Sequence, residues 1–287
     1  MPRIELSAGA VDYVDAGHGP VIVLVHGLLM DHTLWDAVVA DLATDHRVLA
    51  PTLPLGAHRE PVRTDADLTM AGIAGLLAEF LDRLDLRDVV LVGNDTGGAL
   101  VQLLMAERHD RIGRAVLVSC DAFDHFPPRV TGTTLLLTGK LPPALFGLFM
   151  QQLRLRAMRR LPIAFGWLTR RGDATVKGWL RPILTDAATR RDAVRMLRAA
   201  ARHKNFLVEA AESLPAFDRP VLVVWASEDR VMPIEDGRRL ADLVPHGRFV
   251  EIDDSATLIP LDQPAALARH VRDFATKPAE SDRTGVR

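Results

Sequence analysis

Short runs of apolar residues alternate with segments of helical spacing through the first half of the chain. Near-continuous apolar runs bounded by turn residues are typical of strands buried on both faces. Such runs occur at 21–25, 48–50, 89–92 and 115–118, and two more follow at 221–225 and 249–252. Between the second and third runs, apolar residues repeat at helical spacing from Leu68 to Leu84. The alternation predicts a parallel sheet whose strands are joined by right-handed crossovers through helices.

Two segments depart from this alternation. Residues 4–6 and 11–14, on either side of Gly9, predict an antiparallel hairpin at one edge of the sheet. Residues between the fourth and fifth parallel strands have helical spacing, several prolines and no strand-like run, so they predict a helical insertion. The predicted domains are an α/β core at 1–129 and 215–276, a helical cap at 130–214, and a flexible tail at 277–287.

The composition is that of an ordinary globular protein. The chain has 287 residues, of which 48% are hydrophobic and 25% charged, which is enough to bury a full core. The single cysteine, Cys120, excludes an internal disulfide. The N-terminus has no apolar signal core, and the most apolar stretch, 135–150, is broken by Lys140 and two prolines. We therefore expect no membrane span and a cytoplasmic location, whereas the composition leaves the oligomeric state open.

Charge is distributed unevenly along the chain. The net charge is −2, yet the segment from Arg129 to Lys204 holds 16 Lys and Arg residues against three acids. A split this large indicates modular organisation and a basic cap.

The strongest motif is the run from Val90 to Leu100, which reads VLVGNDTGGAL. A strand leads directly into a helix through a turn with small residues two positions before and after Asp95. A nucleophile elbow requires this spacing, since its central residue is strained and its neighbours must let strand and helix approach. An ionised carboxylate there needs no base to become a nucleophile, and it prefers saturated electrophilic carbon. The alternative is a solvent-facing Asp in a glycine-rich turn; the glycine spacing excludes a dinucleotide fingerprint.

With this elbow the chain resembles the α/β-hydrolase superfamily, particularly its Asp-nucleophile branch of haloalkane dehalogenases and epoxide hydrolases, over nearly its whole length. The resemblance implies an α/β-hydrolase fold: a mostly parallel, eight-stranded sheet with helices on both faces and a helical cap insertion. Residues 23–28 resemble the strand and the oxyanion loop of His26 and Gly27. By this match the backbone N–H groups of Leu28 and Thr96 face developing negative charge.

The same resemblance supplies supporting residues. Trp35 stands where the family often has an aromatic residue. Residues 224–233 look like the strand and acid turn of the catalytic triad, so Asp229 would orient the base; the alternative role is a helix cap. Some dehalogenase-like members carry their acid after the strand preceding the cap, and Asp124 is the second candidate on that ground.

Two positions depart from the family pattern. Thr257 stands where the family's catalytic histidine is expected, and threonine cannot act as a base near neutral pH. Thr96 follows the nucleophile where related dehalogenases have tryptophan, and Leu28 replaces a halide-holding asparagine. Ordinary haloalkane dehalogenation is therefore disfavoured.

Three histidines lie on loops that the fold brings to the carboxyl edge of the sheet. His26 lies in the oxyanion loop, where its usual role is to shape that loop. His58 follows the strand beside the elbow and could replace the missing base, or be a solvated loop residue. His125, next to Asp124, has the same two alternatives.

The basic cap could determine substrate shape. Its arginines either form a solvated face or attract an anionic substrate, an acyl carrier or a membrane surface. The apolar residues that would line a pocket or form the core of the cap are Leu145, Phe146, Phe149, Met150, Leu153, Phe165, Trp167, Leu168 and Trp179. Nucleic acid is excluded as a partner because no binding motif accompanies the charge.

The sequence thus predicts a hydrolase of a small, largely apolar electrophile, such as an epoxide, a halide or an activated ester. Asp95 attacks and Asp229 supports a base. A cofactor-free lyase or isomerase that uses Asp95 as general base is the enzymatic alternative, and a ligand-binding protein on a degenerate hydrolase fold is the other. Neither metal-ligand spacing nor a phosphate loop is present in the sequence, so we expect no metal and no organic cofactor.

Overall fold

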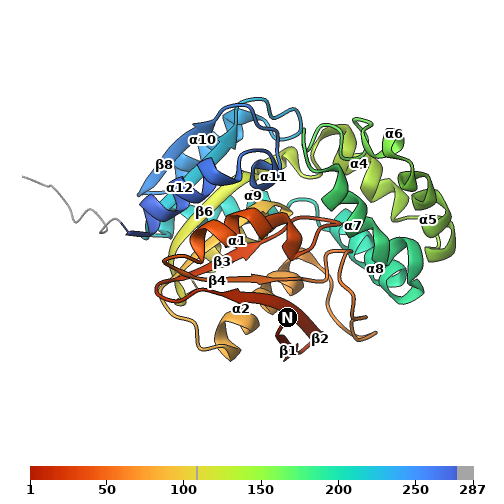
Figure 1. The fold of residues 1–287 in the computed structure, drawn as a ribbon, viewed down its shortest axis with the longest axis horizontal. Helices are drawn as coiled ribbons and strands as arrows, with labels where there is room; N and C mark the ends of the chain where they lie inside the picture. The colour runs from red at the N-terminus through yellow and green to blue at the C-terminus, as the bar shows by residue number, and fades with distance from the viewer. Residues whose placement is uncertain (108, 277–287) are drawn as a thin grey trace, which may run out of the picture.

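A single twisted sheet organises the chain. The computed structural model describes residues 1–107 and 109–276 (Figure 1). Its eight strands lie in the order β1-β2-β4-β3-β5-β6-β7-β8, with β1 and β2 antiparallel to their neighbours and the others parallel. The strands are β1 (Arg3–Leu6), β2 (Gly9–Ala16), β3 (Val21–Val25), β4 (Arg47–Pro51), β5 (Val89–Asp95), β6 (Ile112–Cys120), β7 (Val221–Ala226) and β8 (Gly247–Ile252). The predicted mostly parallel, eight-stranded α/β fold is confirmed.

The central strands are buried over almost their whole length. Every residue of β5 and β7 is buried, and β3 exposes only part of Val21. The reason is that helices cover the sheet, so that both faces of a central strand need apolar side chains. The apolar runs of the sequence therefore coincide with the strands, and the segments around Gly9 form the hairpin β1–β2.

The helices outside the insertion pack in two groups. Helix α1 packs against α12 and α11, whereas α3 packs against α2 and α9, and α10 lies on β7 and β8. Their bounds are α1 (Asp36–Leu42), α2 (Met70–Arg83), α3 (Thr96–Ala106), α9 (Phe206–Ser213), α10 (Ile234–Leu243), α11 (Ile259–Asp262) and α12 (Pro264–Thr276), with short 3₁₀ turns η1 (His32–Trp35), η2 (Phe123–His125) and η4 (Leu214–Ala216).

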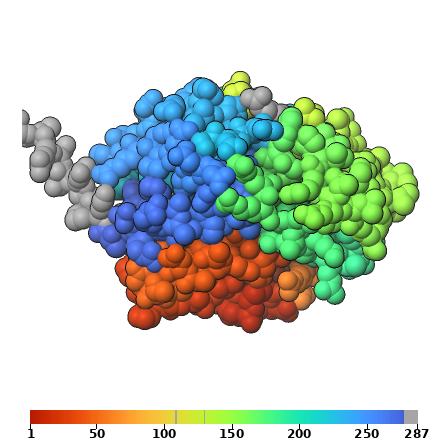
Figure 2. Space-filling view, turned by 45° about the horizontal axis from the view of Figure 1, so that its top comes forward, coloured from red at the N-terminus to blue at the C-terminus, as the bar shows by residue number. Residues whose placement is uncertain are grey.

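Between β6 and α9 the chain forms a separate set of helices beside the sheet, here called the inserted helices (Figure 1). They are α4 (Arg129–Thr138), α5 (Pro143–Met150), η3 (Gln151–Arg154), α6 (Arg156–Arg159), α7 (Asp173–Thr185) and α8 (Ala187–Arg202). Figure 2 shows residues around 150 at the end of the molecule farthest from the blue C-terminal elements. The exact division into core and cap at residues 130 and 214 stays a prediction, and the predicted tail at 277–287 lies outside the described residues. No described helix is both long enough and apolar enough to cross a membrane.

Candidate active site

The turn between β5 and α3 is built as a strained elbow. Asp95 has φ 56° and ψ −131°, in a region that favours glycine. A Cβ on Gly93 would lie 2.4 Å from the carbonyl oxygen of Gly97, and one on Gly97 would lie 2.2 Å from that of Val25. The small residues of the motif are therefore required for strand and helix to approach each other.

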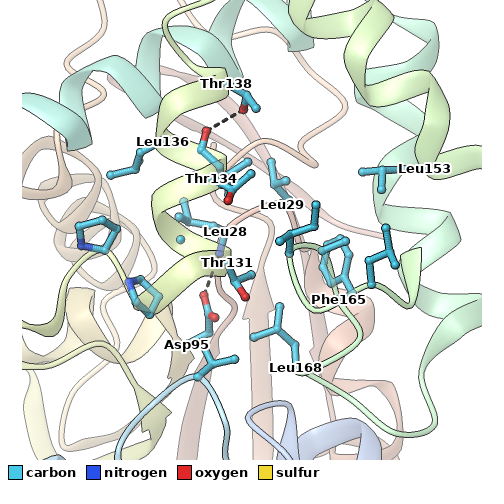
Figure 3. A pocket seen from close by; sticks show the side chains of 18 of the residues that line it. Leu28, Leu29, Asp95, Thr131, Thr134, Leu136, Thr138, Leu153, Phe165 and Leu168 are labelled. Carbon is cyan, nitrogen blue, oxygen red and sulfur yellow. Dashed lines mark hydrogen bonds between the residues drawn. The ribbon is translucent and has the colours of Figure 1, made fainter. Parts of the chain in front are cut away.

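The Asp95 carboxylate is held by two backbone donors. Its Oδ1 accepts a hydrogen bond from the N–H of Thr96, at 2.6 Å. It accepts a second from the N–H of Leu28, at 3.3 Å (Figure 3). A Cβ on Gly27 would lie 2.3 Å from the same oxygen, so only glycine fits beside it. Burial raises the pKa of Asp95, and the two N–H donors oppose that shift because they stabilise the charged form.

An apolar cavity lies over Asp95. It lies between the elbow and the inserted helices and leaves about 100 Å³ for the centres of water-sized molecules. Figure 3 shows Asp95 at one end, with Thr131, Thr134 and Thr138 of α4 along one wall and Leu153 farther away. Among the described residues that line this cavity, Asp95 is the only ionisable one.

The predicted acid turn contacts the predicted histidine position. Oδ1 of Asp229 accepts hydrogen bonds from the N–H groups of Val231 and Met232, at 2.9 and 2.8 Å, and from the Thr257 hydroxyl, at 2.8 Å. Its Oδ2 is buried without a hydrogen-bond partner among the described residues. Burial raises the pKa of Asp229 to about 6. The side-chain amide of Asn94 donates to the Thr257 carbonyl at 2.8 Å and so ties this loop to the elbow.

His26 is fixed by the oxyanion loop. Its Nε2 accepts from the N–H of Leu53 at 3.0 Å, so Nδ1 carries the proton and donates to the Gly27 carbonyl at 2.9 Å. Burial lowers the pKa of His26 to about 4. The ring is therefore neutral and both nitrogens are in use, which suits a role in shaping the loop.

The other two candidate histidines lie outside the cavity lining. His58 is buried, with Nε2 3.7 Å from Oδ2 of Asp192 in α8, and neither ring nitrogen has a hydrogen-bond partner among the described residues. His125 is half-exposed, and its Nδ1 lies 2.6 Å from Oδ2 of Asp236. The structure therefore brings no histidine of the described chain into the cavity wall.

Trp35 and Asp124 also lie outside the cavity lining. The Trp35 side chain is fully buried in the core, and Asp124 is exposed on η2.

A carboxyl group that sequence reasoning missed lies next to the elbow. Asp121 is buried, and its Oδ2 accepts a hydrogen bond of 2.8 Å from the Thr96 hydroxyl. Burial and the adjacent Asp95 carboxylate raise the pKa of Asp121 well above its usual range. The available signal was that Asp121 directly follows β6, the strand that pairs with the elbow strand.

The lone cysteine lies behind the elbow. Cys120 pairs with Asp95 across β5 and β6, and a Cβ on Gly98 would lie 2.3 Å from its Cβ. Its thiol is buried, which raises its pKa and makes it an inert structural residue. Among the residues that the structure describes, no group of three or more His, Cys, Asp or Glu could hold a metal ion.

Known proteins match the chain over nearly its whole length. The family described as "alpha/beta hydrolase fold" matches residues 20–264. Haloalkane dehalogenase 2 of Mycobacterium tuberculosis is 25% identical over 92% of this chain and 91% of its own. An ancestral haloalkane dehalogenase superposes with a TM-score of 0.75 at 20% identity, over 96% of this chain and 98% of the other. The enol-lactonase of Burkholderia xenovorans gives 0.73 at 20% identity, over 96% and 100%.

The family match covers far more than half of the chain, and the sheet order, the elbow and the apolar cavity over Asp95 agree with it. The chain therefore belongs to the alpha/beta hydrolase fold family, and it is a hydrolytic enzyme of that family.

Proposed function

We propose that the protein hydrolyses a small, largely apolar electrophile through an ester of Asp95. The observation that carries this proposal is that Asp95 is the one ionisable side chain among the described residues of an apolar cavity wall. Oδ1 is occupied by two backbone donors, so attack falls to Oδ2. The new bond joins Oδ2 to carbon as a carbon–halogen bond or a ring carbon–oxygen bond breaks. The bonding electrons leave with the halide, or they stay on the oxygen of the opened epoxide, which takes a proton from water.

The occupied donors favour saturated carbon as the site of attack. A carbonyl substrate needs N–H donors for its own developing oxyanion. Here the N–H groups of Leu28 and Thr96 already bind Oδ1 of Asp95, so a substrate carbonyl would have to displace that oxygen. Epoxides and alkyl halides make no such demand, and we place them before activated esters.

The same donors suit the second step. Water attacks Cγ of the Asp95 ester, and the negative charge develops on Oδ1, where Leu28 and Thr96 already donate. Water must also lose a proton, and no histidine lines the cavity among the described residues. We therefore expect release of the ester to be slower than its formation.

Intact-protein mass spectrometry tests the proposal. The protein is incubated with a panel of epoxides, alkyl halides and activated esters, and the adduct is mapped by peptide analysis. The proposal requires an adduct on Asp95 that is absent in Asp95→Asn. Where turnover is too fast for accumulation, a single turnover in H₂¹⁸O must leave ¹⁸O in the Asp95 carboxylate. If the protein turns over members of the panel and neither an adduct nor the ¹⁸O label appears on Asp95, the idea of a carboxylate nucleophile is refuted.

A second function has one observation in its favour. Burial raises the pKa of Asp95, and a carboxylate in an apolar cavity is a good acceptor for a proton on carbon. On this alternative the protein is a cofactor-free lyase or isomerase and Asp95 is its general base. Exchange of a substrate C–H for deuterium in D₂O, lost in Asp95→Asn and without any adduct, would decide for it.

A further inference from the structure

The inserted helices expose most of the large apolar side chains found on the surface. Among the described residues, the most exposed large apolar side chains outside this region are Met1 and Val208. The others are Val130, Leu137, Leu145, Leu148, Phe149, Leu155 and Ile163. An apolar surface concentrated in one short segment marks an interaction site more often than scattered residues do.

Helix α5 has apolar side chains on two sides. Phe146 and Met150 are buried in the protein. Leu145, Leu148 and Phe149 are exposed and lie three and four residues apart, so they share one face of the helix. Leu148 is 69% exposed, so its side chain is not part of the core of the inserted helices.

This face continues along the chain to the mouth of the cavity. Leu155, which follows η3, is 63% exposed, and α5 and α6 both pack against η3. Phe149 and Ile163 are exposed and also line the cavity over Asp95. We call Leu145, Leu148, Phe149, Leu155 and Ile163 the apolar rim.

The rim lies in a segment that carries only positive charge. No Asp or Glu occurs between residues 129 and 172. Exposed cations stand between the apolar residues, at Lys140, Arg154, Arg156 and Arg160. Arg156 lies 3.7 Å from Asp173 but is 68% exposed, whereas Arg159 is buried in a 2.9 Å ion pair with the same carboxylate and therefore has a structural role.

We propose that the apolar rim docks on an anionic lipid bilayer. Apolar side chains flanked by Arg and Lys are the chemistry that enters the headgroup region of such a membrane. Docking by this face would open the cavity towards the lipid, so that an apolar substrate could reach Asp95 without crossing water. A second copy of the chain fits less well, because two rims of the same positive charge would face each other.

Flotation with lipid vesicles tests the docking. The full chain is mixed with two kinds of vesicle. One is made of phosphatidylcholine alone, and in the other about a third of the lipid is the anionic phosphatidylglycerol. We expect binding to the anionic vesicles that weakens with salt and is far weaker without anionic lipid. Leu145→Ser with Leu148→Ser, and separately Arg154→Gln with Arg156→Gln, should each lower the partition coefficient about tenfold. Val208→Ser and Arg87→Gln, which change exposed residues outside the rim, are the matched controls and should bind like the wild type.

Three results would overturn the docking: no binding to anionic vesicles, binding that the rim variants leave unchanged, or a dimer in light scattering that the Leu145 and Leu148 changes dissolve. Circular dichroism and a thermal melt confirm that each variant is folded. The docking does not depend on the chemistry of Asp95, so Asp95→Asn should bind vesicles normally. Failure of either proposal can thus be told from failure of the other.

Discussion

The hydroxyl of Thr96 donates a 2.8 Å hydrogen bond to Oδ2 of the buried Asp121, while the N–H of the same threonine holds the Asp95 carboxylate. Thr96 thereby contacts two buried carboxyl groups, one through its hydroxyl and one through its backbone N–H. Burial and the adjacent Asp95 carboxylate raise the pKa of Asp121 well above its usual range, so Asp121 holds its proton more tightly than an exposed carboxyl group does. The two contacts use different atoms of Thr96, so substitution can separate them.

Thr96→Val removes the hydroxyl and keeps the backbone donor. Oδ1 of Asp121 already has no hydrogen-bond partner among the described residues, and the change removes the Thr96 hydroxyl that donates to Oδ2. We expect the free energy of unfolding to fall by about 1–3 kcal/mol, measured by urea denaturation. The rate of adduct formation on Asp95 should stay within about threefold of wild type. A large loss of that rate in a stable variant would show that the hydroxyl acts in the chemistry.

Gly27→Ala tests whether the Asp95 carboxylate must stay beside the N–H of Leu28. The added Cβ would lie 2.3 Å from Oδ1 of Asp95, so the side chain must leave the N–H of Leu28. We expect release of the Asp95 ester to slow by about 100-fold, the usual cost of losing one donor to a developing oxyanion. Gly75→Ala in α2 is the control, because its Cβ would meet nothing within 4 Å and should leave the rate unchanged. An unaltered rate in a correctly folded Gly27→Ala protein would contradict this geometry.

Thr257→His tests whether a histidine at this position restores the missing base. The Thr257 hydroxyl already lies 2.8 Å from Oδ1 of Asp229, so an imidazole has an acid partner in place. We expect the Asp95 ester to be released about 100-fold faster, as followed by the decay of the adduct mass. Thr257 is fully buried, so the larger ring should also cost about 1–3 kcal/mol of stability. Thr257→Val, which removes the hydroxyl without adding a base, should not shorten the lifetime of the ester.

Asp229 makes stability depend on pH in a defined window. Its pKa rises from 3.8 to about 6 on folding, so the folded state binds its proton more tightly than the unfolded state. The contribution of this group is fully present below pH 4 and is lost as pH rises to about 6; it amounts to about 3 kcal/mol. Asp229→Asn, which retains an acceptor oxygen for Val231, Met232 and Thr257, should flatten the fall in unfolding free energy between pH 4 and 6. An unchanged slope would place the ionised form of Asp229 in the folded protein throughout.

The sheet could be predicted because each central strand is an unbroken apolar run. Both faces of β3, β5 and β7 are covered, so successive residues of each strand are buried and apolar residues follow one another in the sequence. The elbow could also be predicted, since a Cβ on Gly93 or Gly97 would lie 2.4 or 2.2 Å from a backbone oxygen and the motif therefore requires glycine there. Both features depend on short stretches of consecutive residues, so the sequence of each stretch is enough to predict them.

The residues around the elbow were harder to predict because they depend on where a strand ends. Two aspartates follow β6 three residues apart, and the sequence favoured Asp124 as the second acid. The chain turns at Phe123, which has φ 52°, and this turn leaves Asp121 inside and Asp124 in solvent. His58 depends on a still more distant contact, since Asp192 approaches it from α8, 134 positions later. Neither the turn nor that contact has a signature in the sequence nearby.

The position of Cys120 makes the protein its own reporter. It is the only thiol in the chain, it is buried, and it faces Asp95 across the β5–β6 pair. Its side chain lies against Gly98 and Gln102 of α3, so a maleimide can reach it only when the packing between β6 and α3 opens, and each labelling event is a single mass step. The rate of labelling measures how often the packing behind the elbow opens. It needs no engineered probe and can be followed in the presence of a substrate.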